Sequence, residues 1–175
     1  GALSALGEPG SRGIKYVADK INESGGLDVG GEKYKVELLV RDDGSSAETA
    51  RAVAQRLITE DKVDVLVAGV GSNIVASVMP IVERYGVPAI TTFAYSVKVM
   101  PENPKFGFVN VMSLVDQFEG PLQFLKENGV KKVALAASND DLGEGFVQEM
   151  PRFLDKYQLE LAHTERFETN TTNFA

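Results

Sequence analysis

The chain of 175 residues contains no cysteine and a single histidine, His163. The lack of cysteine excludes disulfide bonds, thiolate zinc sites and a cysteine nucleophile. One imidazole without thiolates is too few for a zinc site. A Ser-His-Asp set would have to recruit His163 from an alternating, strand-like pattern. We therefore interpret this histidine as a surface or structural residue, and we expect no catalytic residues.

Long apolar runs and basic clusters are also missing. No stretch approaches the roughly 18 apolar residues of a membrane-spanning helix, and the run Val63–Val70 is strand-sized and interrupted by Asp64. Lys131–Lys132 is only a pair, and the net charge is −7. A negative chain argues against nucleic acid and against anionic lipid as partners. Gly1–Ser4 lacks the features of a signal peptide, which decides nothing because such a segment is removed from a mature chain.

What the sequence does contain is a regular alternation of helical and extended patterns, with 43% hydrophobic residues to form a core. Apolar spacing and end signals predict helices over Gly10–Ser24, from a capping box at Ser45–Glu48 to Glu60, and over Asn73–Tyr85, Asp116–Asn128 and Leu142–Tyr157, with kinks at Pro80 and Pro151. Extended runs predict strands over Tyr34–Val40, Val63–Gly69, Val87–Thr92, Phe106–Val109, Val133–Ala137 and Leu159–Phe167.

Strands separated by helices of this length indicate an α/β fold with parallel, Rossmann-like sheets and helices on both faces. A crossover at Asn110–Val115 would divide the chain into residues 1–113 and residues 114–175. Both ends resemble interrupted lobes: the first helix lacks a preceding strand, and Leu159–Phe167 has no parallel sheet to finish. Residues 170–175 are expected to begin another element.

Ligands of parallel sheets bind beyond the carboxyl ends of the strands, which draws attention to Gly69–Asn73. Gly71 lets a ligand approach the backbone, Ser72 supplies a hydroxyl, and the helix that begins here offers free N–H groups. Together they could bind a carboxylate or a phosphate. The structural alternative is that Ser72 caps its helix and the glycines permit a tight turn. The residues alone leave both readings open.

Other kinds of site find little support. The dinucleotide motif needs a third glycine where Ile74 stands, and an acidic residue where Phe93–Tyr95 stands. Asp42–Asp43 could hold magnesium only with a third Asp after Val63–Gly69, which is missing, and Asp140–Asp141 with Glu144 lacks the spacing of a calcium loop. Both pairs are interpreted as loop and cap carboxylates. No metal and no cofactor is therefore predicted.

Four aromatic residues follow strand ends or lie in a short strand. Phe93 and Tyr95 fall on the same side of an extended stretch, and they could line a pocket or pack in the core. Phe106 and Phe108 are predicted to be core residues.

Several segments, in this order, carry a resemblance to a known family: Gly13–Gly26 (GIKYVADKINESGG), Val40–Asp43, Val63–Ser72, Tyr85–Ile90 and Leu142–Gly145. Together they resemble the branched-chain amino-acid-binding type of ABC-transporter solute-binding protein, a type I periplasmic-binding-protein fold. The resemblance implies two α/β lobes that close on a small ligand. That family is about twice as long, so this chain would hold most of the first lobe and the beginning of the second.

The resemblance also implies roles for individual residues. Ser72 would grip a ligand carboxylate, and the backbone of Ala94 would bind the same group. Ser96 would replace a hydroxyl residue that Tyr95 displaces, and Leu142 stands where the family often has Tyr. The expected ligand-binding residues are Gly71, Ser72, Asn73, Phe93, Ala94, Tyr95, Ser96 and Leu142.

The departures from the family pattern concern the tail of the ligand. Leu142 and Leu6 replace expected aromatic residues, whereas Phe93 and Tyr95 are new aromatic residues. We expect a carboxylate whose tail differs from that of leucine, with amino acid and plain acid both open. By resemblance, the protein would be periplasmic or extracellular, with or without a lipid anchor, and would deliver its ligand to a membrane permease. The alternatives are a single-domain nucleotide-binding enzyme using Gly69–Asn73, and a sensor domain of the same fold.

Overall fold

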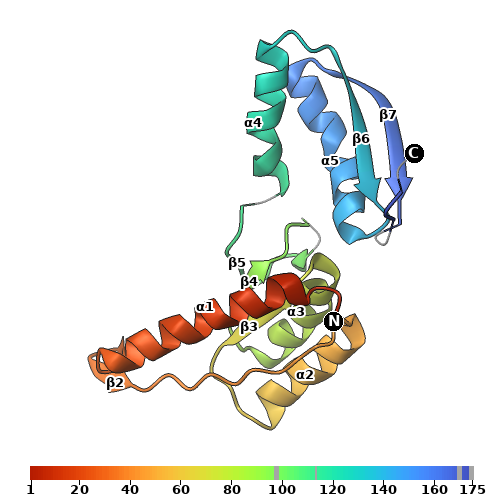
Figure 1. The fold of residues 1–175 in the computed structure, drawn as a ribbon. Helices are drawn as coiled ribbons and strands as arrows, with labels where there is room; N and C mark the ends of the chain where they lie inside the picture. The colour runs from red at the N-terminus through yellow and green to blue at the C-terminus, as the bar shows by residue number, and fades with distance from the viewer. Residues whose placement is uncertain (97–98, 113, 169–170, 174–175) are drawn as a thin grey trace.

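The computed structural model, which describes residues 1–96, 99–112, 114–168 and 171–173, consists of two successive α/β lobes (Figure 1). The first lobe has a three-stranded parallel sheet in the order β3 (Leu66–Val70), β4 (Ala89–Phe93) and β5 (Gly107–Val109). Helices α2 (Ala47–Thr59) and α3 (Ser72–Tyr85) cover one face, and α1 (Ser4–Glu23) crosses the other near β3. The predicted α/β fold with parallel strands is confirmed.

The second lobe is built on two parallel strands, β6 (Lys132–Ser138) and β7 (Glu160–Phe167). Helices α4 (Leu114–Glu127) and α5 (Asp141–Tyr157) pack together, and α5 packs on both strands. The expectation that the last strand has no parallel partner is wrong, because β7 pairs with β6 along its whole length. In chain order, β5 of the first sheet is followed by α4 of the second lobe, and the division of the chain into residues 1–113 and 114–175 stays a prediction.

One predicted helix boundary and one predicted strand are also wrong. α1 begins at Ser4 and not at Gly10, because the helix continues through Pro9. The predicted strand Tyr34–Val40 is replaced by an antiparallel hairpin, β1 (Leu27–Val29) and β2 (Glu32–Tyr34), followed by irregular backbone over residues 35–42. The apolar pattern of these residues is strand-like, but a strand also needs a hydrogen-bonded neighbour, and no described strand lies beside them.

Two further predictions concern the prolines within helices and residues 170–175. α3 and α5 continue through Pro80 and Pro151 without a break in the helix, and the bends expected at these prolines stay a prediction. Of the element expected over residues 170–175, only residues 171–173 are described, and they form no regular structure.

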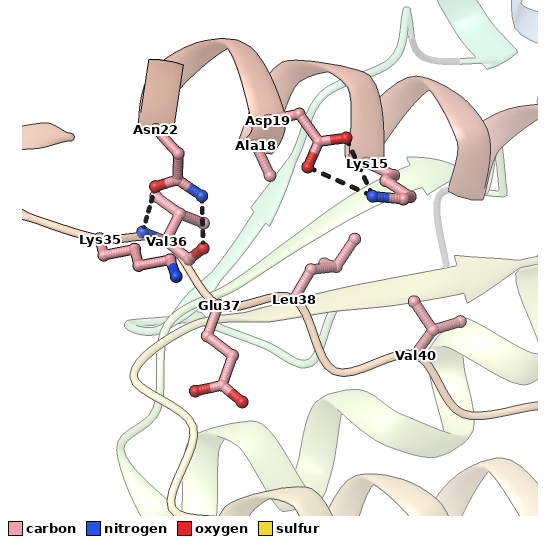
Figure 2. A pocket seen from close by; sticks show the side chains of 9 residues that line it. All are labelled: Lys15, Ala18, Asp19, Asn22, Lys35, Val36, Glu37, Leu38 and Val40. Carbon is pink, nitrogen blue, oxygen red and sulfur yellow. Dashed lines mark hydrogen bonds and ion pairs between the residues drawn. The ribbon is translucent and has the colours of Figure 1, made fainter. Parts of the chain in front are cut away.

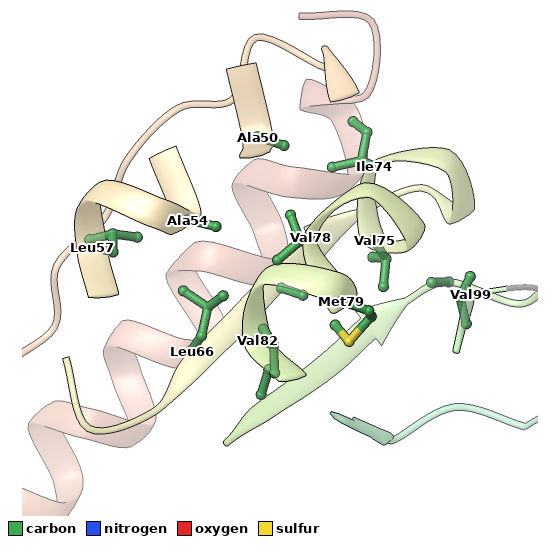
Figure 3. Close-up of a cluster of buried hydrophobic side chains, with 13 residues drawn as sticks. Ala50, Ala54, Leu57, Leu66, Ile74, Val75, Val78, Met79, Val82 and Val99 are labelled. Atoms are coloured by element: carbon green, nitrogen blue, oxygen red, sulfur yellow. The ribbon is translucent and has the colours of Figure 1, made fainter. Parts of the chain in front are cut away.

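The core of the first lobe lies between the sheet and the α2–α3 layer (Figure 3). Ile74, Val75, Val78, Met79 and Val82 recur at helical spacing, so that one face of α3 is fully buried against β3 and β4. Phe106 packs against this cluster as predicted. The prediction for Phe108 is wrong: its side chain is 54% exposed, on the opposite face of the sheet.

A carboxylate anchors the start of β5. Glu83, near the end of α3, accepts hydrogen bonds from the backbone N–H groups of Lys105, Phe106 and Gly107 at 2.9–3.1 Å. The Phe106 N–H is the main cause that lowers the pKa of Glu83 below its ordinary value. This side chain therefore joins the C-terminal part of α3 to the edge strand and fixes where β5 begins.

We expect Glu83→Gln to lower the Tm, because an amide oxygen replaces the ionised acceptor of three N–H groups. A lowered folded-state pKa contributes stability that is fully present above the unfolded value, about 4.3, and is lost as the pH falls through the folded value. The Tm difference between wild type and variant should thus be largest above about pH 5 and shrink in acid. Thermal melts from pH 7 to pH 3 measure it; a difference that grows towards acid contradicts this role.

Candidate functional site

The turn between β3 and α3 is held in an unusual conformation by one glycine. Gly71 has φ = +103°, which side-chain-bearing residues rarely adopt. Its N–H donates to the Phe93 carbonyl at the end of β4 (2.9 Å), and its carbonyl accepts from the Val75 N–H (3.0 Å). The carboxyl ends of β3 and β4 and the start of α3 therefore meet at Gly71.

Ser72 is the first residue of α3, and it does not cap the helix. The residue at the N-cap position is Gly71, and no side chain caps α3. The Ser72 hydroxyl is buried and instead accepts a hydrogen bond from the Ser96 N–H at 3.2 Å. The structural alternative of a capping serine is thus wrong. Because a hydroxyl has one proton to donate, Ser72 can accept from Ser96 and donate to a third group.

The stretch after β4 contributes alternating side chains. Ala94 and Ser96 are buried, whereas Phe93 and Tyr95 are partly exposed. Phe93 lies against α1, where a Cβ added to Gly10 would stand 3.9 Å from the Phe93 ring. The structure therefore brings Gly71, Ser72, Asn73, Ala94 and Ser96 to one edge of the sheet, with two aromatic rings beside them.

In the second lobe, α5 begins directly after β6. The Asp140 carboxylate accepts from the Gly143 N–H at 2.9 Å and caps the helix. Gly143 packs on the end of β6 so closely that a Cβ would overlap the backbone of Ser138. Leu142, in this first turn, is partly exposed.

The two lobes approach each other through helices α3 and α5. The N-terminal end of α5 is turned towards the first lobe (Figure 1). A helix start carries a partial positive charge, and the Asp140 carboxylate that caps α5 already offsets part of it. Glu144 in the first turn of α5 is paired with Arg166 at 2.5 Å, so its negative charge is offset locally.

The other acidic and imidazole groups have local roles. Asp42 and Asp43 accept from the Gly44 and Ser45 N–H groups. His163 is exposed beside Glu165. Within the described residues, no group of His, Asp and Glu is arranged to hold a metal ion, and no helix is long and apolar enough to cross a bilayer.

A separate groove lies away from these residues. It runs between α1 and residues 35–40, and no predicted ligand-binding residue lines it (Figure 2). The candidate site is an open edge at which the sheet, α3 and the start of α5 come together.

Two positions at this edge were missed from the sequence. Gly10 lies beside the Phe93 ring, at a distance where a Cβ would make an ordinary contact, and Gly143 allows α5 to start against β6. The Gly143–Glu144–Gly145 sequence could have signalled a close backbone approach, as glycines often do. Nothing local marks Gly10, because its neighbour Phe93 is remote in the sequence.

Comparisons with known proteins agree with this fold. A family model described as periplasmic binding protein matches residues 1–175. An amino acid binding protein from Pseudomonas aeruginosa is 32% identical over 162 residues, which are 89% of this chain and 41% of that protein. The chain therefore spans less than half the length of this relative.

Solved structures also match this chain over less than half of their own length. The branched-chain amino acid transporter substrate binding protein LivJ from Streptococcus pneumoniae, in complex with isoleucine, matches with a TM-score of 0.84 and 26% identity over 99% of this chain and 48% of that chain. A solute binding protein of an ABC transporter from Rhodopseudomonas palustris, in complex with 3,4-dihydroxy benzoic acid, matches with a TM-score of 0.75 and 22% identity over 90% and 43%. The second likeness shows the fold alone.

We expect Gly143→Ala to destabilise the second lobe by about 1–3 kcal/mol, because the new methyl group meets fixed backbone and not a flexible side chain. Gly120→Ala is the matched control: Gly120 lies inside α4 with open space around it, and alanine there should stabilise by about 0.5–1 kcal/mol. Urea unfolding followed by circular dichroism compares the two. Equal effects of both substitutions would contradict the close packing at Gly143.

Proposed function

Because residues 1–175 belong to the periplasmic binding protein family, we propose that the protein captures a small carboxylate ligand between its two lobes and delivers it to an ABC transporter. The fold and the family are those of solute-binding proteins. The observation that carries the finer proposal is the buried Ser72 hydroxyl, which accepts from the Ser96 N–H and keeps its own proton to donate.

A carboxylate suits this place for two reasons. The Ser72 hydroxyl donates one hydrogen bond, and the first N–H groups of α3, including that of Asn73, have no partner within the helix. Both are donors at the positive end of a fourteen-residue helix, where a negative charge is stabilised. The backbone beyond Ala94, which Ser72 already holds through Ser96, forms the opposite wall.

Phe93 and Tyr95 favour a ligand with a bulky tail. Both side chains are partly exposed beside the buried Ala94 and Ser96, so a ligand held by its carboxylate at Ser72 would extend along aromatic surface. Aromatic rings bind other rings and long aliphatic chains favourably. We therefore expect an aromatic or longer aliphatic acid, or an amino acid with such a side chain.

The start of α5 supplies the second lobe's part of the site. Leu142 in its first turn would contact the ligand from the opposite side, and Gly143 allows α5 to begin directly against the end of β6. A ligand that touches both lobes favours their closed arrangement by its higher affinity for it. The closed form would dock on a membrane permease in the periplasm or at the cell surface, with or without a lipid anchor.

The nucleotide alternative loses support from the position of Asp43. Its carboxylate lies so close to Gly69 that a Cβ there would stand 2.8 Å from Oδ2. A negative charge beside the glycine turn disfavours the several negative charges of a nucleotide phosphate.

The test is a thermal-shift screen of the protein at its natural full length against aromatic and aliphatic carboxylates, branched and aromatic amino acids, sugars and nucleotides. A true ligand at about 100 times its Kd should stabilise by about 2.7 kcal/mol. Ser72→Ala should weaken the best carboxylate about ten- to hundred-fold in calorimetry, because a hydrogen bond to a charged group is lost.

Ser24→Ala is the matched control. Its hydroxyl donates to the Ile21 carbonyl at the far end of α1, so this substitution removes a serine hydroxyl without touching the site. Ligand affinity should be unchanged in this variant. Stabilisation by nucleotides or sugars alone, or equal affinity of Ser72→Ala and wild type for a carboxylate, would overturn the proposal.

A further inference from the structure

The carboxyl end of β7 is joined to the turn between β6 and α5 by three contacts. The Asn139 N–H donates to the Phe167 carbonyl at 2.7 Å, and the Asn139 Nδ2 donates to the Glu168 Oε1 at 2.8 Å. On the same strand, the Arg166 Nη2 donates to the Glu144 Oε2 at 2.5 Å. The last residues of β7 and the first turn of α5 therefore form one connected surface.

This surface lies where a ligand between the lobes would meet the second lobe. The carboxyl ends of β6 and β7 are turned towards the first lobe (Figure 1). Leu142, the proposed ligand contact, lies in the same first turn of α5 as Glu144. Residues two apart on a helix point to different sides, so Glu144 would act on a ligand held at Leu142 through its charge and not by contact.

The pair of Arg166 and Glu144 is partly withdrawn from solvent. The two side chains are 34% and 38% exposed, whereas those of Arg56 and Glu60 on α2 are 65% and 66% exposed. Glu144 also accepts a hydrogen bond from the Gln148 Nε2 at 2.7 Å, which helps to fix its carboxylate. Partly buried charges are screened less by water and salt, so the charge state of this pair matters to a neighbouring ligand.

Other carboxylates at this end keep their negative charge. Asp140 accepts hydrogen bonds from a hydroxyl and a backbone N–H, and Glu168 accepts one from a side-chain amide. Such neutral donors satisfy a carboxylate without cancelling its charge. Arg166 brings a full positive charge to this end and places it against Glu144. Without Arg166, an anion enclosed by the second lobe would meet an additional uncompensated carboxylate.

We propose that Arg166 is a specificity-determining residue, which acts by holding and neutralising Glu144 at the start of α5. The pair shifts the preference of the site towards a carboxylate ligand without an ammonium group. With Arg166 removed, Glu144 repels such a ligand and attracts the ammonium group of an amino acid. This inference rests on the proposed function, and it makes Arg166 a positioning residue that does not itself touch the ligand.

The test compares two probes of similar shape, phenylpropionate and phenylalanine, which differ by the ammonium group. Calorimetry measures the Kd of each probe for the protein at its natural full length. Arg166→Gln should weaken phenylpropionate relative to phenylalanine by about ten-fold at about 0.01 M salt, the effect of a unit charge about 10 Å away at an effective dielectric constant of about 20. The shift should nearly vanish at about 1 M salt, where the Debye length is about 3 Å.

Three further variants separate the charge of Arg166 from its packing. Arg166→Lys keeps the positive charge and should keep the wild-type ratio of the two Kd values. Arg166→Gln combined with Glu144→Gln removes both charges and should restore that ratio. Arg56→Gln is the matched control, because it breaks another Arg–Glu pair and changes the net charge equally, but in the last turn of α2. It should leave the ratio unchanged.

A ratio that stays constant in Arg166→Gln overturns the inference, because a merely structural role weakens both probes equally. A shift of the same size in Arg56→Gln also overturns it. In either case, binding of a carboxylate that Ser72→Ala weakens leaves the proposed function standing. A wild type that binds neither probe contradicts the aromatic acid expected from the proposed function, and it overturns this inference as well.

Discussion

The hydrogen bond from the Gly71 N–H to the Phe93 carbonyl ties the carboxyl ends of β3 and β4 together. It forms because the backbone at Gly71 turns through a positive φ, which directs the chain away from β3 and into α3. The same turn places Ser72 within reach of the Ser96 N–H. The position of the helix start, the buried serine and the stretch after β4 all depend on this one backbone conformation.

The sequence predicted most of the helices and the parallel strands because their apolar spacing is local and strong. The Ile74–Val82 stripe and the Leu66–Val70 run identify α3 and β3 without any knowledge of their neighbours. Residues 35–42 show the limit of such reasoning: their pattern is strand-like, yet a strand exists only beside another one. The prediction that Phe108 is a core residue was wrong for a related reason, because the burial of its side chain depends on what covers that face of the sheet.

The candidate site was predictable at β3–α3 and less so elsewhere. The spacing of the glycines and the position directly after a buried strand predict Gly71 and Ser72 as site residues. Whether Ser72 caps its helix could not be predicted, because the answer depends on the Ser96 N–H, which lies 24 residues away in the sequence. The packing of Gly10 on Phe93 and of Gly143 on Ser138 is likewise a matter of tertiary contact, which no local pattern encodes.

In the described part of the chain, β3 is the outer strand of its sheet, and an unpaired strand edge can pair with the edge of a second molecule. Each copy carries a net charge of −7, so two copies repel each other before their exposed edges can meet. This repulsion acts over about 10 Å at 0.1 M salt and over about 3 Å at 1 M. We therefore expect this charge to oppose association of two molecules through the edge of β3, and concentrated salt to weaken that opposition.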